Sequence, residues 1–446
     1  LGFEKGDFHD FSEYSPEMLE YCKRDTEVTR LVAQQLEKEG VASNSQSYNL
    51  ECKVRAIIDK QQKNGFAFKL KEAMILQAQL QDELHELERK AEEDFEPNVI
   101  ELKTKTKYIP FNIASRKQIA ERLKDKGWKP KQMTDKGNVI INEAVLSKIK
   151  KPKEVIPLAK MFNRYFLLQK RTGLIKSWIM ACEEDNRVRG KVMTLRTITG
   201  RMAHAVPNMA QVPAIYSPYG RECRGLWTVD DESKYRLVGV DASGLELRCL
   251  AHYMNDPEYT NIVLTGDVHT ANQQAAGLQT RDQAKTFIYA FLYGAGAAKI
   301  GKLVGGNPKT GQQLINKFLS KLTSLNKLRN DVQERVRQYN TIRGLDGRLL
   351  HIRSEHSALN TLLQGAGAVV CKQWLVHIME RVNKAAIDVK LVASIHDEYQ
   401  FEVAIPDIER FCRLTKEAMT QTTKTLKMKC ELDCDYKIGK TWADTH

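Results

Sequence analysis

The chain has 446 residues, too many for one compact core, so two to four domains or subdomains are expected. Its apolar runs, such as 389–395, are too short to cross a bilayer, and acidic residues interrupt any N-terminal signal peptide. The nine scattered cysteines contain no CxxC pair, which argues against zinc and disulfides and fits a reducing compartment. We therefore expect a cytoplasmic protein that is not secreted. The net charge of +13 mildly favours a polyanionic partner. The chain begins with Leu1 rather than methionine, which suggests an excised or truncated chain.

The N-terminal part of the chain predicts helices. Apolar and charged positions follow a helical rhythm over residues 16–39, a polar linker is expected at 42–48, and helical pattern resumes at 49–62. A break at Asn64-Gly65 precedes a long charged helix at 70–95, and two helices joined by a glycine turn favour an antiparallel pair. The positions of the first helix expected to be buried are Leu19, Cys22, Val28, Leu31, Val32 and Leu36.

The second half of the chain predicts short strands between helices. Short apolar runs bounded by turn residues indicate strands, and apolar positions three and four residues apart indicate helices. In chain order we expect a helix at 158–181, a strand at 238–241, helices at 245–253, 280–293 and 309–338, and a hairpin of 389–395 with 399–403.

Two acidic positions that are far apart in the sequence each follow an apolar strand. Asp241 closes the first predicted strand, and Asp397 and Glu398 stand in the tight connection of the hairpin. Taken alone, Asp241 reads as the N-cap of the next helix and residues 396–398 as a polar turn. Carboxylates at the ends of strands can meet in one sheet, where they suit two divalent cations for phosphoryl transfer. We therefore expect Asp241 and Asp397 to converge.

The helix expected at 280–293 carries a stripe of two cations and two aromatic rings at spacings of four. Such a stripe suits a nucleoside triphosphate, with the cations on the phosphates and a ring near the base. The helix alone is explained equally well by a side that faces solvent at its start and the core at its end. The Tyr-Gly-Ala-Gly ending and the nearby segment 266–269 favour a nucleotide-binding site. The stripe consists of Arg281, Lys285, Tyr289 and Tyr293.

Two polar segments suggest contact with nucleic acid. Residues 199–201 and 207–211 form loops with donors and few acids, which suit phosphates or the minor-groove acceptors of a duplex. Asn360 and Gln364, one helical turn apart, could serve in the same way. An ordinary solvated loop and an ordinary helix-surface pair are the alternatives.

Together these residues resemble the family A DNA polymerases, and in particular their bacteriophage replicative branch. Asp241-Ala-Ser-Gly-Leu-Glu-Leu-Arg, Arg281-x3-Lys285-x3-Tyr289-x3-Tyr293-Gly294 and His396-Asp397-Glu398 look like motifs A, B and C in the right order. The likeness extends from about residue 49 to the end and includes Phe111-Asn112, Thr199-Gly200-Arg201 and Lys440-Thr-Trp442.

The resemblance implies an α+β right-hand fold with an antiparallel palm sheet and largely helical thumb and fingers. Residues 1–44 would be a remnant of a 3′–5′ exonuclease domain and a linker. The thumb would be 45–181, the palm 182–253 with 360–446, and the fingers 254–359.

The resemblance also implies a template-directed DNA polymerase that adds deoxynucleotides to a primer 3′-hydroxyl. Asp241, Asp397 and the carbonyl of Ala242 would hold two Mg²⁺ ions, with Mn²⁺ as an alternative, and Glu398 would support catalysis beside them. Glu246 would crowd a ribose 2′-hydroxyl, and Tyr289 predicts good acceptance of dideoxynucleotides. The residues implied to bind the nucleotide are Glu246, His269, Arg281, Lys285, Tyr289 and Tyr293. Those implied to contact primer-template DNA are Lys170, Arg171, Arg201, Asn208, Gln211, Arg224, Asn360, Gln364 and His396.

Two departures from the family pattern limit what the chain is expected to do. A proofreading nuclease needs several acids, but only its last motif is visible, as Tyr21-x3-Asp25, which alone reads as an ordinary amphipathic helix. We therefore expect no exonuclease activity from this chain. Some phage enzymes insert a thioredoxin-binding loop in the thumb, whereas the corresponding stretch, 95–110, is short. We expect a monomer without thioredoxin, with helicase-primase or other replisome proteins as candidate partners and no membrane contact.

Three alternatives are weaker. A single-subunit RNA polymerase needs room for the 2′-hydroxyl, against which Glu246 and Tyr289 argue. A catalytically inactive DNA-binding module is disfavoured by the intact Asp241, Asp397 and Lys285. A nuclease would need more acids than the N-terminal segment contains.

Overall fold

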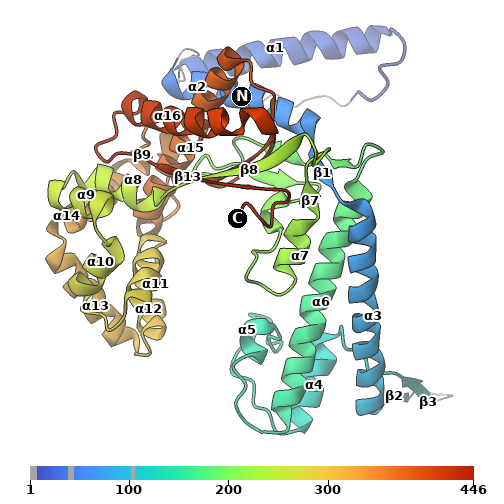
Figure 1. Ribbon diagram of the computed structural model, residues 1–446. Coiled ribbons are helices and arrows are strands. Elements are labelled where there is room, and N and C mark those ends of the chain that lie inside the picture. The colour runs from blue at the N-terminus through green and yellow to red at the C-terminus, as the bar shows by residue number, and fades with distance from the viewer. Residues whose placement is uncertain (1–7, 39–44, 102–105) are drawn as a thin grey trace.

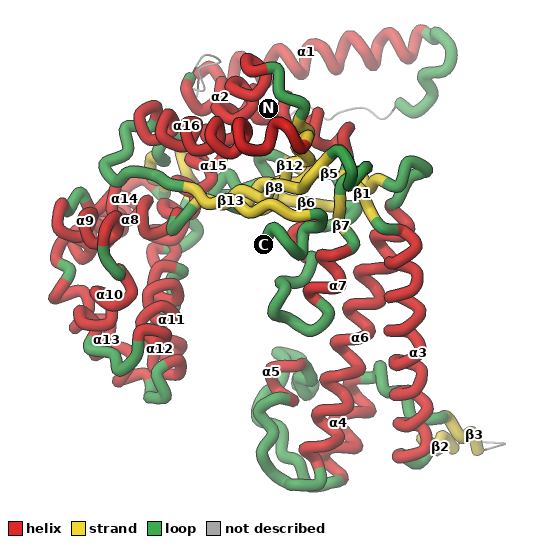
Figure 2. Tube along the Cα trace, in the orientation of Figure 1, coloured by secondary structure: helices red, strands yellow, loops and turns green. Residues whose placement is uncertain are grey.

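A small central sheet carries two long helical arms (Figure 1). The structure is a computed structural model that describes residues 8–38, 45–101 and 106–446. One arm runs through α3 to α6 and the other through α9 to α14, and the sheet lies between their upper ends (Figure 2). The α+β class expected from the sequence is confirmed, and all nine cysteines are free. None of the described helices combines the length and apolarity needed to cross a membrane.

The central sheet has four antiparallel strands in the order β11-β12-β8-β13. One face packs on two helices, with Trp374 against Tyr399 and Phe401 against Phe411 at ring distances of 5.6 and 4.9 Å. Gly239 in β8 is required by close approach, because a Cβ there would stand 2.7 Å from the Thr445 carbonyl. The strands are β8 (Tyr235–Ala242), β11 (Val389–Ile395), β12 (Glu398–Ala404) and β13 (Cys434–Gly439), and the covering helices are α15 (Ala358–Ala385) and α16 (Ile408–Thr425).

The first arm is built on α3 (Leu70–Asp94), which packs along α6 (Val155–Ala181). The expected antiparallel pairing of α3 with the helix before it is wrong. The strand β1 (Phe66–Phe68) separates the two, and α2 (Gln46–Asn64) packs instead on α15 and β11. Because apolar β1 pairs with two other strands, the glycine turn does not close a helical hairpin. Those strands are β4 (Arg187–Val188) and β7 (Trp227–Thr228), and the arm also contains β2 (Asn98–Glu101), β3 (Thr106–Ile109), α4 (Arg116–Asp125) and α5 (Glu143–Leu146).

The second arm is a cluster of helices around α11 (Arg281–Leu292). The apolar side of α11 packs inward, with Phe287 in edge contact with Phe318 at 5.0 Å, whereas Arg281, Lys285 and Tyr293 of the stripe are exposed and Tyr289 is partly buried against the core. Thr280 caps this helix as expected. The other elements are α8 (Leu245–Met254), α9 (Pro257–Thr265), α10 (Val268–Ala276), α12 (Ala297–Leu303), α13 (Pro308–Lys321), α14 (Thr323–Tyr339), β9 (Thr341–Arg343), β10 (Leu349–His351) and η2 (Glu355–Ser357).

The first helix, α1 (Pro16–Lys38), forms where the sequence predicts it but buries none of its residues. The predicted burial of its apolar side is therefore wrong, since periodicity reveals an apolar face but not whether anything covers it. Residues 42–44 of the expected linker lie outside the described residues, and 46–48 already belong to α2. The remaining elements are β5 (Lys191–Met193), β6 (Ala203–Ala205), η1 (Met209–Gln211), α7 (Gly220–Gly225) and η3 (Ile405–Asp407).

Candidate active site

The two predicted acids come together at one end of the central sheet. Asp241 is the penultimate residue of β8, and Asp397 lies in the two-residue turn between β11 and β12. The backbone N–H of Ala242 donates to the carbonyl of Asp397 at 3.1 Å, which fixes the turn against the end of β8. Gly244 precedes α8 and no side chain caps that helix, so Asp241 does not act as its N-cap.

Like charges surround Asp241. In the sheet register it pairs with Glu398 on β12 and with Asp435 on β13. Although the residue is exposed, loss of water around its carboxyl group, followed by the charge of Asp397 and then those of Glu398, Asp435 and Glu246, raises its pKa to about 7. Burial and the charge of Glu246 also raise the pKa of Asp397. Crowded carboxylates of this kind favour a bound cation, which would relieve their repulsion.

The donor set fits divalent cations that share their coordination with a substrate. Among the residues described, no cluster of three or more His, Cys, Asp or Glu side chains could hold a metal alone. Asp241, Asp397 and the Ala242 carbonyl offer oxygen donors, and oxygen is the ligand that Mg²⁺ prefers. Magnesium typically binds through one or two carboxylates plus substrate phosphates, so an incomplete protein ligand set is the expected arrangement.

Glu398 is buried beneath the acids as a fixed anion. Its Oε1 accepts hydrogen bonds from Trp442 Nε1 at 2.7 Å and Gln400 Nε2 at 2.5 Å, and His446 Nδ1 lies 3.0 Å from Oε2. Burial alone would raise its pKa, but these hydrogen bonds outweigh it and hold the pKa below its usual value. The sequence analysis named Glu398 but not the residues around it: Gln400 lies two residues further along β12, whereas Asp435 and His446 come from a distant strand and the C-terminal turn, with no local signal.

His396 forms a strained corner beside Asp397. Its φ of +58° lies in the left-handed region, which non-glycine residues rarely adopt. Backbone strain of this kind clusters at functional sites. Burial, followed by the nearby charge of Arg201, lowers the pKa of His396, so its imidazole is mostly neutral at neutral pH.

Glu246 joins three elements next to the acids. The hydroxyl of Tyr293, at the end of α11, donates to Glu246 Oε1 at 3.1 Å, and Arg201 Nη2 lies 3.5 Å from the same oxygen. The Tyr289 ring lies between those of Tyr293 and His269, at centroid distances of 6.5 and 6.1 Å. The tyrosine half of the stripe therefore faces the acid-rich end of the sheet.

The two cations of the stripe differ in their surroundings. Arg281 Nε lies 2.6 Å from Asp267 Oδ2, so its charge is already matched. Lys285 is exposed, and within the described part of the chain no ion pair holds it. Partial burial, together with the charges of Arg281 and Lys285, lowers the pKa of His269.

A model of DNA polymerase family A matches residues 72–444. The chain belongs to this family. It is 37% identical over 379 residues to the DNA-directed DNA polymerases of Enterobacteria phage T3 and Escherichia phage T7, covering 77% of this chain and 54% of each relative. DNA polymerase I of Geobacillus stearothermophilus is 26% identical over 361 residues, covering 75% of this chain and 40% of that protein. The chain thus spans about half the length of the phage relatives it matches.

A solved structure shares the fold. The POL domain of Pol1 from M. smegmatis, in complex with DNA primer-template and dNTP, superposes with a TM-score of 0.78 at 18% identity. The match covers 88% of this chain and 70% of that one. The α+β right-hand architecture expected of a family A polymerase is thereby confirmed.

The residues expected to contact DNA fall into two groups. Arg171 and Arg224 are buried: Arg171 Nε donates to the Pro218 carbonyl, and Arg224 lies 4.2 Å from the centre of the Trp442 ring. These contacts favour structural roles, because neither guanidinium faces solvent. The others are exposed or half-buried: Lys170, Arg201, Asn208, Gln211, Asn360, Gln364 and His396. Among these, Asn208 caps η1, and Asn360 accepts a hydrogen bond from Gln364. Tyr21 and Asp25 lie on α1, away from the acids (Figure 1).

The raised pKa of Asp241 predicts a pH-dependent effect of its removal. Between its ordinary value of 3.8 and about 7, the folded state keeps a proton that the unfolded chain loses, so this group's contribution to stability falls as pH rises. Asp241→Asn should therefore unfold at a higher temperature than the wild type in metal-free buffer at about pH 8, with a smaller difference at about pH 5. Thermal unfolding in the presence of a chelator measures this. A difference that does not grow with pH would contradict the proposed crowding of charge.

Proposed function

We propose that the chain is a DNA-directed DNA polymerase that adds deoxynucleotides to a primer 3′-hydroxyl with the help of two divalent cations. The observation that carries the proposal is the meeting of Asp241 and Asp397 at one end of the sheet, opposite the tyrosine half of the α11 stripe. Membership of family A and the relatives named as DNA-directed DNA polymerases support it.

Asp241, Asp397 and the Ala242 carbonyl would hold Mg²⁺ ions, with Mn²⁺ as an alternative. When bound, such ions lower the pKa of the attacking hydroxyl and neutralise charge on the triphosphate and the leaving pyrophosphate. The chain's own contribution is to fix its donors. The Ala242–Asp397 backbone hydrogen bond sets the turn, and the anionic Glu398 below keeps the potential negative.

The exposed stripe of α11 would receive the incoming nucleotide. Lys285 would bind phosphate oxygens directly. Arg281 would first have to release Asp267 before its guanidinium could bind phosphate. His269 would donate to the same phosphates, and Tyr289 would lie near the base. Glu246, whose carboxylate accepts the Tyr293 hydrogen bond, would crowd a ribose 2′-hydroxyl.

Primer-template DNA would lie between the two helical arms (Figure 2). We assign residues 45–181 to the thumb, 182–253 with 360–446 to the palm, and 254–359 to the fingers. Lys170 on α6 would meet phosphates, and the affinity would fall steeply with salt. Arg201, Asn208, Gln211, Asn360, Gln364 and His396 would contact the minor groove and the primer end.

Glu246→Ala is expected to raise the use of ribonucleotides relative to deoxynucleotides by about 10- to 100-fold, the range that one steric group in a pocket supplies. The shortened side chain removes the obstacle to the 2′-hydroxyl and also the Tyr293 hydrogen bond. Single-nucleotide incorporation with rATP and dATP measures the ratio. Tyr293→Phe is the control, because it breaks the same bond but leaves the carboxylate. An unchanged ratio for Glu246→Ala would remove its gating role.

Primer extension with Mg²⁺ tests the proposal as a whole. A primed template with deoxynucleotides should yield full extension, and ribonucleotides should yield little. Preferred use of ribonucleotides would favour the RNA polymerase alternative, and binding without extension would favour an inactive module.

We also propose that this chain does not proofread, because its sequence holds only the Tyr21-x3-Asp25 nuclease motif. A mismatched primer end should then persist, and its removal would refute this part.

A further inference from the structure

A buried cluster of four charges lies behind the active site and takes no part in the mechanism above. Lys372 of α15 is 1% exposed, and its Nζ donates to both carboxylate oxygens of Glu51 on α2, at 2.7 and 2.8 Å. The same ammonium donates to the carbonyl of Thr194 at 2.9 Å. Lys372 therefore connects α2 to the residue that follows β5.

Glu51 is shared with a second cation. Arg348, just before β10, places Nη2 2.8 Å from Glu51 Oε1 and 2.7 Å from Asp346 Oδ2. Its guanidinium also lies against Gly200, where an added Cβ would stand 2.8 Å from Nη1 and where φ is +75°. One carboxylate thus balances two cations, of which one reaches Thr194 and the other Gly200.

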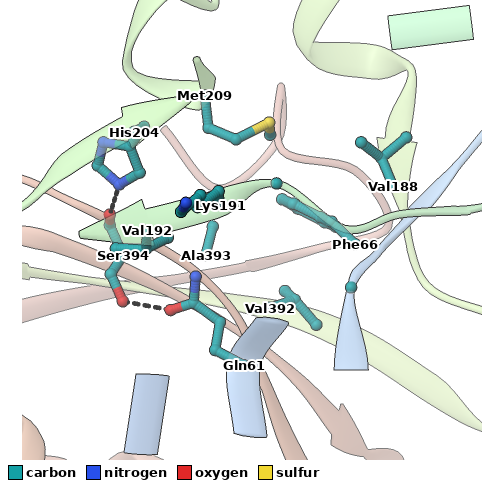
Figure 3. A pocket seen from close by; sticks show the side chains of 12 residues that line it. Gln61, Phe66, Val188, Lys191, Val192, His204, Met209, Val392, Ala393 and Ser394 are labelled. Atoms are coloured by element: carbon teal, nitrogen blue, oxygen red, sulfur yellow. Dashed lines mark hydrogen bonds between the residues drawn. The ribbon is translucent and has the colours of Figure 1, made fainter. Parts of the chain in front are cut away.

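The loop 194–202 joins β5 to β6, and these contacts bond its first residue, Thr194, and pack the Arg348 guanidinium against Gly200 near its other end. The loop carries Arg201, whose Nη2 lies 3.5 Å from Glu246 Oε1. The strands on either side are tied down as well. In β5 the backbone N–H of Val192 donates to Gln62 Oε1 of α2 at 2.8 Å. In β6 the Nε2 of His204 lies 2.7 Å from the carbonyl of Ser394 in β11, whose hydroxyl lies 2.5 Å from Gln61 Oε1 of α2 (Figure 3). The strands have these supports of their own, so the charge cluster acts on the loop between them.

We propose that Glu51 is a positioning residue for the polymerase reaction: by balancing Lys372 and Arg348 it holds loop 194–202 so that Arg201 stands beside Glu246. Buried ion pairs are costly to form, and replacement by apolar groups is often neutral or stabilising. A purely structural cluster could therefore be replaced without harm to activity, whereas a positioning cluster could not. The kinetic part of this proposal rests on the proposed function, and the structural part does not.

Hydrogen exchange in the free, full-length chain tests the structural part. Glu51→Gln keeps the shape of the side chain but leaves Lys372 and Arg348 without their shared anion. Local opening of the loop then no longer costs a charged hydrogen bond. The amides of 194–202 should therefore exchange about tenfold faster than in the wild type. Glu380→Gln is the matched control, since Glu380 lies on α15, the helix of Lys372, in an exposed pair with Lys53 of α2. Its loop should exchange as in the wild type. Unchanged loop exchange in folded Glu51→Gln would overturn the proposal, whether or not the chain polymerises.

A double-variant cycle tests the kinetic part. Glu51→Gln should lower kcat/KM for the nucleotide by about 10- to 100-fold, because small misplacements of a contact group have effects of this size. If Glu51 acts through Arg201, Glu51→Gln combined with Arg201→Ala should lose no more than Arg201→Ala alone. Losses that multiply would show independent roles and overturn the positioning role.

A charge-balanced variant covers the case in which Glu51→Gln does not fold. Glu51→Gln with Lys372→Met removes one charge of each sign and leaves Arg348 paired with Asp346. This variant should fold and still show fast exchange at 194–202, because Thr194 has lost the donor to its carbonyl. A loop as protected as in the wild type would overturn the proposal.

Discussion

Asp397→Ala is expected to lower the rate of primer extension by about a thousandfold or more, since metal ions at such sites supply several kcal/mol of transition-state stabilisation. The change removes one of the two carboxylates that meet at the end of the sheet. Asp241 would then be left as the single acidic donor beside the Ala242 carbonyl. Single-nucleotide incorporation at saturating primer-template, with Mg²⁺, measures the rate.

Asp388→Asn is the matched control for this experiment. Asp388 precedes β11 at the opposite end of the same hairpin, where it accepts a hydrogen bond from the Tyr235 hydroxyl at 2.8 Å. Its removal should leave extension close to the wild-type rate. Asp397→Ala should also keep its affinity for primer-template, because the change reduces negative charge near the DNA. Equal extension by Asp397→Ala and the wild type would remove the proposed metal site.

Lys285→Met is expected to lower kcat/KM for the incoming nucleotide by about 100-fold, a size typical for the loss of one charged or hydrogen-bonding group aimed at developing charge. Lys285 is the exposed cation of the stripe without an ion pair among the described residues, whereas Arg281 is held by Asp267. Methionine keeps most of the length of the side chain and removes the charge. Pre-steady-state incorporation over a range of nucleotide concentrations separates the effect on binding from that on the rate.

Lys309→Met provides the control for Lys285→Met. Lys309 is exposed in the first turn of α13, outside the stripe of α11. Its loss changes the net charge by the same amount and should leave kcat/KM within about twofold, the scale of surface electrostatics. If both variants lose activity equally, the effect comes from the overall field rather than from a phosphate contact. A smaller effect for Arg281→Ala than for Lys285→Met would match the pairing of Arg281 with Asp267.

The elements predicted well are those whose local pattern decides their structure. Helix α11, with its Thr280 cap and its apolar side, and the hairpin around His396 form as expected. The wrong predictions concern partners. Helix α1 buries none of its residues, and α2 packs on α15 rather than on α3. Periodicity identifies a face, but the sequence does not reveal which distant element covers it.

The same division holds for the site. Asp241 and Asp397 follow apolar strands and were predicted together, and the structure places them together. Asp435 escaped prediction, because it reaches Asp241 through strand pairing across almost 200 residues of chain, whereas the hydrogen bond from Trp442 to Glu398 spans 44 residues. Arg224, for which the family resemblance implied DNA contact, is buried with its guanidinium 4.2 Å from the centre of the Trp442 ring, a packing that the sequence alone did not reveal.

The strand order of the central sheet has a consequence for synthesis of the protein. Strand β8 is flanked by β12 and β13, and both neighbours are translated well over a hundred residues later. Until they emerge from the ribosome, β8 has both edges open, and its apolar run of Leu237, Val238 and Val240 invites pairing with other nascent chains. Asp241 and Asp397 therefore cannot come together until β12 has been translated, and β8 can pair wrongly before then.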